Sequence, residues 1–344
     1  MSEGTRIDPV DPPNLHGGPL GSAGFKRDPG DFVVEEILGF EPSGEGEHCF
    51  LWIEKIGHNS NDVAGILAER AGVRKRLVSH CGLKDLHAIT RQWFSIHLPG
   101  QESPAPEQLE VEGVKVLRVE RNTRKLRRGS HDGNRFAIRL RDCEFDRDAA
   151  AERWVQIVER GVPNYFGPQR FGKNGRNIGQ ALRLFSGEWE VRDRPLRGLL
   201  ISAARSYLFN ACVAERVRRE LWDRVLDGEV FGFAENRSLV LPGNLRGDEC
   251  QRVAEGMLEV TAPLWGEGDS LSEGQVRELE RELAAAHPEI ARGLESFGLR
   301  QERRVIRLRP GNAEHEWQGD DFLLRFELPK GAYATTVLRE LALL

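Results

Sequence analysis

The chain has 344 residues, of which 30% are charged and 39% are hydrophobic, a balance typical of a globular protein with a buried core. No run of apolar residues is long enough to span a bilayer, and the N-terminal residues MSEGTRIDPVDPPNLHGG lack the features of a secretory signal. The sequence therefore predicts a cytoplasmic protein without membrane segments. Five scattered cysteines without C-x-x-C spacing argue against a disulfide framework or a zinc site, so we expect no metal.

Alternating apolar and polar residues predict most of the strands. In chain order, strands are expected at Asp31–Ile37, Cys49–Lys55, Leu77–Cys81, Gln92–Leu98, Val114–Val119, Arg135–Leu140 and Phe322–Leu328. Helical spacing and capping residues predict the helices. These are expected at Asn59–Gly72 (N-cap Asn61), Asp146–Gly161, Ser202–Leu226 and Glu273–Ala286, and after the turn PKGAY near the C-terminus.

The order of these elements indicates an α+β protein. The first 160 residues mix strands and helices without a regular βαβ rhythm. The middle of the chain is rich in helices, and the last segment returns to strand alternation. This order, with a helix-rich segment between two strand-bearing segments, indicates that one domain is inserted into another.

The segment GPQRFGKN (Gly167–Asn174) is close to a phosphate-binding loop. A nucleotide hydrolase would need a Ser or Thr after Lys173, where Asn174 stands, and a central strand upstream, where Pro163 could not pair. We therefore expect no nucleotide cofactor. The interleaved aromatic and basic residues fit two alternatives, which are contacts with RNA bases and phosphates or a buried turn between domains.

A strongly basic segment lies within a chain whose net charge is −5. RVERNTRKLRR (Arg118–Arg128) contains six basic residues and one acidic residue. A local patch of this kind suits a polyanionic partner, although a solvated Arg-rich loop would have the same composition.

Several segments together closely resemble one enzyme family. These are SHCGLKDLHAITRQWFSIHLPG (Ser79–Gly100), NYFGPQRFG (Asn164–Gly172) and SAARSYLFN (Ser202–Asn210). DPGDFVVEE near the N-terminus and LPKGAYATTVLREL near the C-terminus match as well. The chain from about Phe25 to its end thus resembles the TruD family of tRNA pseudouridine synthases.

The resemblance implies a fold and an activity. It implies a split catalytic domain, residues 1–159 and 306–344, with a mixed, mainly antiparallel sheet, and an inserted helix-rich α/β domain, residues 160–305. The implied reaction is the isomerisation of uridine to pseudouridine in tRNA, at uridine 13 of the D arm in bacterial members, without a metal or cofactor. Nothing in the sequence demands more than a monomer.

The resemblance also assigns site residues. The G-x-K-D motif makes Asp85 the catalytic carboxylate, and a nearby cation that keeps it ionised is expected. Lys26 is the first candidate for that cation and Lys84 the second. The substrate contacts implied by the family pattern are Phe32, Asn134, Phe136 and Tyr333, although each aromatic ring could equally belong to the core. The expected contacts to the RNA backbone are Arg121, Arg124, Lys125, Arg127, Arg128, Arg170 and Lys173.

Two other functions compete with this prediction. One is a noncatalytic RNA-binding protein on the same scaffold, and the other is a nucleotide hydrolase that depends on Lys173. The adjacent Ser130, His131 and Asp132 are not a catalytic triad, because a triad is assembled in space from separate segments.

Overall fold

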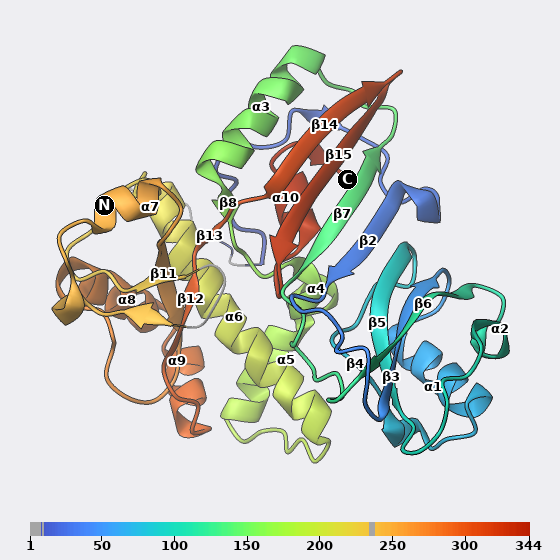
Figure 1. Ribbon diagram of the computed structural model, residues 1–344. Helices are drawn as coiled ribbons and strands as arrows, with labels where there is room; N and C mark the ends of the chain where they lie inside the picture. The colour runs from blue at the N-terminus through green and yellow to red at the C-terminus, as the bar shows by residue number, and fades with distance from the viewer. Residues whose placement is uncertain (1–7, 9, 234–237) are drawn as a thin grey trace. The chain divides into compact units, whose positions relative to one another are not determined.

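The computed structural model describes residue 8, residues 10–233 and residues 238–344, and its chain forms two compact units (Figure 1). One unit, here called the sheet unit, consists of residues 20–158, 310–334 and 342–344. The other, here called the helical unit, consists of residues 159–309 and 335–341 together with residues from 1–19. Both units mix helices with strands, which confirms the predicted α+β class.

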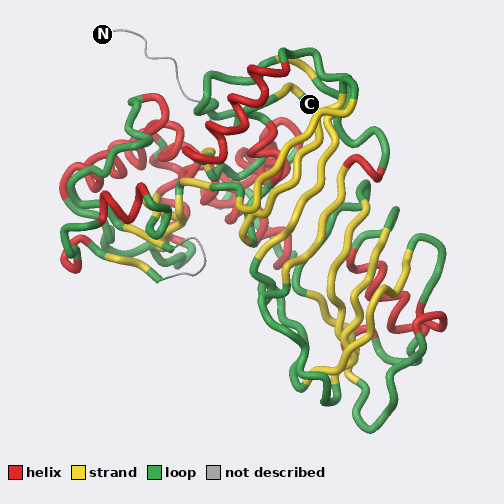
Figure 2. Tube along the Cα trace, turned by 45° about the horizontal axis from the view of Figure 1, so that its top comes forward, coloured by secondary structure: helices red, strands yellow, loops and turns green. Residues whose placement is uncertain are grey.

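The sheet unit is built on a mixed sheet in which every residue is described. Its strands are β2 (Phe32–Ile37), β3 (His48–Lys55), β4 (Val78–His80), β5 (Ile89–His97), β6 (Val114–Asn122), β7 (Gly133–Leu140), β14 (Gly311–Gln318) and β15 (Asp321–Pro329). They lie in the order β14-β15-β7-β2-β5-β3-β6, and β4 also pairs with β5. Only β2 and β5 are parallel, as the mainly antiparallel prediction requires. Figure 2 shows these strands in yellow as one continuous layer.

Two helices cover the same face of this sheet. α1 (Ser60–Arg70) packs Val63 and Leu67 against Leu51 of β3 and its neighbours on β5. α3 (Arg147–Arg160) brings Trp154 to 5.5 Å from the ring of Phe326 on β15. Strand pairing places the two contact areas on one face, because residues paired across neighbouring strands point the same way. The short elements of this unit are β1 (Gly21–Ser22), α2 (Pro106–Leu109) and β16 (Ala342–Leu343).

The helical unit is organised around the long helix α6 (Arg194–Arg218). Its other elements are β8 (Val162–Pro163), α4 (Pro168–Phe171), α5 (Arg176–Phe185), β9 (Phe231–Gly232), β10 (Leu239–Val240), α7 (Glu249–Ala254), β11 (Glu259–Leu264), α8 (Gly274–Ala286), α9 (Pro288–Ser296), β12 (Glu302–Val305), β13 (Arg307–Leu308) and α10 (Ala334–Leu338). Phe209 and Val213 of α6 pack on β11, whereas Leu200 and Leu208 pack with α5 and α9. Short 3-10 helices occur at Pro29–Asp31, Lys75–Leu77, Lys173–Gly175 and Pro242–Asn244. No helix in the described ranges has both the length and the apolar character needed to cross a bilayer.

Two helix starts differ from the prediction. The N-cap of α1 is Asn59, whose side-chain oxygen accepts from the backbone N–H of Asn61 and of Asp62. α6 starts at Arg194 instead of Ser202, because Asp193 accepts from the N–H of Leu196 and proline occupies the first turn. It also ends at Arg218, eight residues before the predicted Leu226. α3, by contrast, has the predicted cap, Asp146.

The near phosphate loop has a different geometry from that of a nucleotide site. Among the described residues, the preceding strand β8 pairs with β13 alone and is antiparallel to it, whereas a phosphate loop follows a buried parallel strand. Gly167–Asn174 forms the one-turn helix α4 and then a tight turn at Gly172, which has a φ of 74°. α5 does begin soon afterwards at Arg176, although its glycines make a poor helix start.

Candidate active site

Asp85 lies in the loop between β4 and β5, and its side chain is 55% exposed. The Nζ of Lys26 is 2.9 Å from its Oδ2. Lys26 has a positive φ of 55°, which is uncommon for a residue with a side chain. The charge-assisted hydrogen bond from the ammonium group orients this carboxylate at the surface.

Aromatic rings line the other side of the Lys26 ammonium. Its Nζ lies 3.9 Å from the centroid of the Phe32 ring, within the range of a cation–π contact. The ring centroids of Phe32 and Phe136 are 6.0 Å apart. Phe136 stacks on Phe326 with a centroid distance of 5.5 Å. Phe32 and Phe136 are only 3% and 6% exposed. In this structure both rings therefore belong to the core that adjoins the site.

Lys84 precedes Asp85 but directs its ammonium elsewhere. Its Nζ is 2.5 Å from the Oδ1 of Asn134 on β7 and 3.4 Å from the carboxylate of Glu36 on β2. Both side chains of the Lys84–Glu36 pair are almost fully buried. Lys26 is thus the lysine that reaches Asp85, while Lys84 joins the loop to the sheet and holds Asn134.

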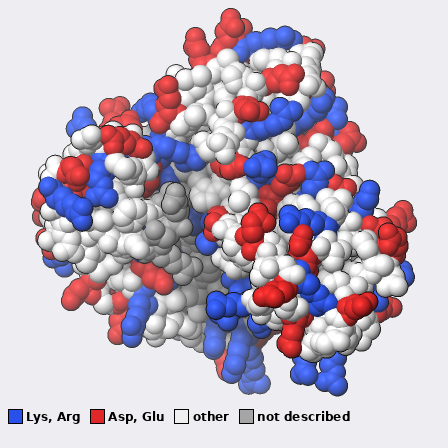
Figure 3. Space-filling model, viewed as in Figure 1, with Lys and Arg blue, Asp and Glu red and all other residues white. Residues whose placement is uncertain are grey.

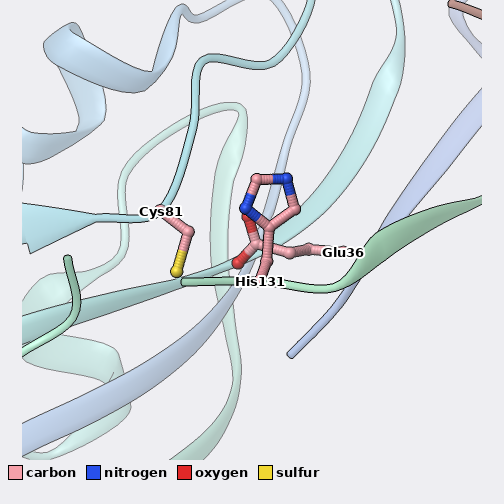
Figure 4. A group of neighbouring side chains, drawn as sticks. All are labelled: Glu36, Cys81 and His131. Carbon is pink, nitrogen blue, oxygen red and sulfur yellow. The ribbon is translucent and has the colours of Figure 1, made fainter. Parts of the chain in front are cut away.

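A buried cluster of ionisable groups adjoins Glu36. Glu36, Cys81 and His131 point toward one another, and one potential ligand atom from each lies within 4.8 Å of the other two (Figure 4). Burial raises the pKa of the Cys81 thiol to about 12 and lowers the pKa of His131 to about 4. A protonated thiol and the Lys84 ammonium beside Glu36 fit a metal ion poorly. The cluster is a group of buried polar side chains beside the Lys84–Glu36 ion pair.

Glu36 and Lys55 are the site residues that the sequence prediction missed. Glu36 continues the row of buried side chains Phe32 and Val34 on β2. Lys55 continues the buried row Leu51 and Ile53 on β3, and its side chain is completely inaccessible. A charged residue at an inward position of an alternating strand is the signal that could have identified both.

The predicted RNA-backbone residues of the sheet unit are near the loop after β6. Arg121 is half-buried and donates to the carbonyl oxygen atoms of Gly46 and Gln101. The remaining four are exposed, namely Arg124, Lys125, Arg127 and Arg128. Lys125, Arg127 and Arg128 line a pocket of about 550 Å³ together with Asn61, Lys75, Ser79 and His80. In Figure 3, Lys and Arg side chains gather at the lower edge of the face, while both signs are interspersed elsewhere.

The other predicted contacts lie apart from Asp85 in the sequence. Tyr333 is half-buried in the turn between β15 and α10. In the helical unit, Arg170 donates to the hydroxyl of Ser202 at 3.1 Å and its guanidinium lies 5.4 Å from the centroid of Phe166. Arg170 thus has structural partners inside its own unit, whereas Lys173 is exposed.

Comparisons with known proteins agree with the resemblance seen in the sequence. A family model described as tRNA pseudouridine synthase D (TruD) matches residues 19–191 and 185–341. A protein of that name from Chromohalobacter salexigens is 43% identical over 346 residues, covering 99% of this chain and 98% of the relative. Another, from Methylococcus capsulatus, is 45% identical over 332 residues, covering 96% and 94%.

A solved structure shares the fold. It comes from Methanosarcina mazei, is described as a tRNA pseudouridine synthase D, and covers 97% of this chain and 95% of its own with a TM-score of 0.70. Its sequence identity of 20% limits this likeness to the fold. Because the family model and the close relatives each span nearly the whole chain, the chain belongs to the TruD family of tRNA pseudouridine synthases.

Proposed function

We propose that this protein converts uridine to pseudouridine in tRNA, at uridine 13 of the D arm, with Asp85 as its catalytic carboxylate. The observation that carries the proposal is the exposed carboxylate of Asp85, held by Lys26 at 2.9 Å on a G-x-K-D loop. The names of relatives that are 43% and 45% identical support the reaction class.

The reaction requires a group with the properties of Asp85. The bond between C1′ and N1 must break, the uracil must turn, and C5 must bond to C1′. A carboxylate can attack C1′, or it can remove the 2′-proton while the base leaves as an anion. Both routes need the anionic carboxylate, which lies beside the Lys26 ammonium, and both need access to the nucleotide, which the 55% exposure allows.

The residues around Asp85 support binding of a nucleotide taken out of its stack. Asn134 would orient a polar edge of the base; it is 9% exposed, and Lys84 fixes its amide oxygen at 2.5 Å. The exposed basic side chains after β6 carry charge that suits RNA phosphates.

Replacing Asp85 tests the proposal directly. In Asp85→Asn, pseudouridine formation on tRNA transcripts should fall to the uncatalysed level, while the dissociation constant for tRNA stays within about threefold, because the amide keeps the shape of the side chain but not its charge. Asp148→Asn, an exposed acid of α3 in the same unit, serves as the control and should keep native turnover. Turnover by Asp85→Asn would rule out this residue as the catalytic group.

The position in tRNA is tested on the substrate side. A transcript in which cytidine replaces uridine 13 should yield no pseudouridine, whereas the native transcript yields one per molecule. Mapping of pseudouridine at another position would contradict the assignment to uridine 13 without affecting the reaction class.

A further inference from the structure

Buried polar side chains form hydrogen bonds with the backbone of the Asp85 loop. Lys55, at the end of β3, directs its ammonium into this loop and is 0% exposed. Its Nζ donates to the carbonyl oxygen atoms of Asp85 at 2.7 Å, His58 at 2.8 Å and Lys84 at 3.5 Å. An ammonium group has three donors, so these three acceptors use its full capacity.

Two further side chains hold the same loop. Ser60, in the first turn of α1, accepts from the backbone N–H of Lys84 at 3.0 Å and donates to the Oε1 of Gln92 at 2.6 Å. Gln92, on β5, donates from its Nε2 to the carbonyl oxygen of Gly82 at 3.2 Å. Ser60 and Gln92 are both 0% exposed.

This polar group interrupts an otherwise apolar interface. Leu51 and Ile53 on β3 and Phe94 on β5 form the apolar contact with α1, and Lys55 and Gln92 occupy the next inward positions. Placing a lysine and a glutamine there costs stability unless their polar atoms are satisfied. Their partners include the carbonyl oxygen atoms of Gly82, Lys84 and Asp85, so part of the cost is linked to the conformation of the Asp85 loop.

We propose that Lys55 is a positioning residue for the isomerisation, which fixes the backbone of Asp85 so that its carboxylate meets the reacting nucleotide, with Ser60 and Gln92 as its supports. This inference rests on the proposed function of Asp85. Lys55 itself reaches only backbone oxygen, and Lys26 alone contacts the Asp85 carboxylate among the described residues for which a contact is given.

The charge of Lys55 makes this support dependent on pH. Burial lowers its pKa to about 8, the Asp85 charge partly offsets that effect, Lys84 adds to it, and Asp62 of α1 opposes it. The residues paired with Lys55 on β5 and β6 carry no charge. Above pH 8 the neutral amine has only two N–H donors for three carbonyl oxygen atoms, so the loop loses part of its support.

The test compares Lys55→Met and Ser60→Ala with native protein on a tRNA transcript. At pH 7, kcat should fall about 100-fold for Lys55→Met, as expected for misplacement of a catalytic group by about 1 Å, with KM nearly unchanged. Ser60→Ala leaves the buried N–H of Lys84 unpaired, and its kcat should fall about tenfold. Lys115→Met, an exposed lysine on the neighbouring strand β6, is the matched control and should keep native kcat.

The pH profile separates positioning from a general loss of structure. The native-to-Lys55→Met ratio of kcat should shrink about tenfold between pH 7 and pH 9, because native protein loses its Lys55 charge and titrations shared by both proteins cancel. Amide exchange in residues 82–88 should accelerate in both variants, while exchange in α3 stays native.

These outcomes distinguish the two proposals. Folded variants with native kcat and native exchange in residues 82–88 would overturn the role of Lys55. If Lys55→Met does not fold, Ser60→Ala decides by the same two measurements. An inactive native protein would contradict the proposed reaction, whereas the exchange of the loop would still test whether Lys55 and Ser60 hold it.

Discussion

His131 and Glu36 are ionisable side chains that folding removes from water behind the Asp85 loop. Burial raises the pKa of Glu36, and the Lys84 ammonium partly reverses that shift. Burial, reinforced by Lys84 and Lys330, lowers the pKa of His131 from 6.5 to about 4. His131 therefore stays neutral in the fold at pH values where the unfolded chain binds a proton. Its contribution to stability is complete above pH 6.5 and declines as the pH falls toward 4.

His131→Asn tests this linkage. Relative to the variant, native protein should lose about 2 kcal/mol of unfolding free energy between pH 7 and pH 5, since each pH unit below 6.5 costs about 1.4 kcal/mol. Urea unfolding at the two pH values, followed by tryptophan fluorescence, gives the difference for each protein. An equal decline in both would show that His131 does not carry this acid sensitivity.

At the scale of the elements, α1 connects the apolar core to the Asp85 loop. Its apolar side packs on β3 and β5, and its first turn provides Ser60 for the backbone of Lys84. Asn59 caps that first turn through two backbone N–H groups, at 2.9 and 3.0 Å. The start of α1 thus has a structural cap and a functional contact within two residues.

Asn59→Ala should weaken α1, whereas Asn61→Ala should not. Loss of the cap costs about 1 kcal/mol, which corresponds to about fivefold faster amide exchange in the first turns of α1 under conditions where exchange follows the opening equilibrium. Asn61 has an exposed side chain and makes no cap, so its replacement should change exchange by less than about twofold. If exchange were faster in Asn61→Ala alone, the N-cap would be Asn61, as the sequence pattern predicts, and not Asn59.

For the whole molecule, a net charge of −5 opposes binding to RNA unless basic groups are concentrated locally. The segment after β6 supplies such a concentration. Lys125, Arg127 and Arg128 line one pocket of about 550 Å³ with Lys75, and its lining in the described part of the chain includes no acidic side chain. Basic and polar side chains dominate the lining of this pocket. Its contribution to tRNA binding should therefore be electrostatic and independent of the base sequence.

Neutralising this pocket should lower tRNA affinity and its dependence on salt. The triple change to alanine at Lys125, Arg127 and Arg128 should weaken binding at least tenfold at low salt, and the slope of log Kd against log salt should fall by about two to three. Filter binding between 50 and 200 mM salt, a range of about fourfold, measures both quantities. The control variant loses the same charge elsewhere in the sheet unit. It carries alanine at Arg70, Lys115 and Arg147. Equal losses in the two triples would contradict a dedicated site.

Strands with a regular alternation of apolar and polar residues were predictable from the sequence. β2, β3, β7 and β15 lie within a few residues of their predicted bounds, because each strand buries alternate side chains. The order of these strands was not predictable, since Phe136 pairs with Phe326 across a long intervening segment. Pairing of this kind depends on packing in three dimensions and leaves no local pattern.

The site residues likewise divide into those that the sequence identified and those that it missed. Asp85 was identified through the family resemblance, because an aspartate in a glycine-containing loop is usually a turn residue. Lys26, 59 positions away, was expected beside Asp85 from the same resemblance, whereas the distance between the two groups is known only from the fold. Lys55 and Glu36 break an inward apolar row, a local signal that sequence reasoning could have used.

The pairing of β15 with β7 has a consequence for synthesis on the ribosome. β7 ends at Leu140, whereas β15 begins at Asp321, so one edge of β7 has no strand beside it until the last part of the chain emerges. An exposed strand edge is a template for wrong pairing and aggregation. A nascent chain stalled in between would carry Asp85, Lys55 and Asn134 but not the strand that completes their sheet. Completion of the sheet around the site thus waits for the synthesis of residues 321–329.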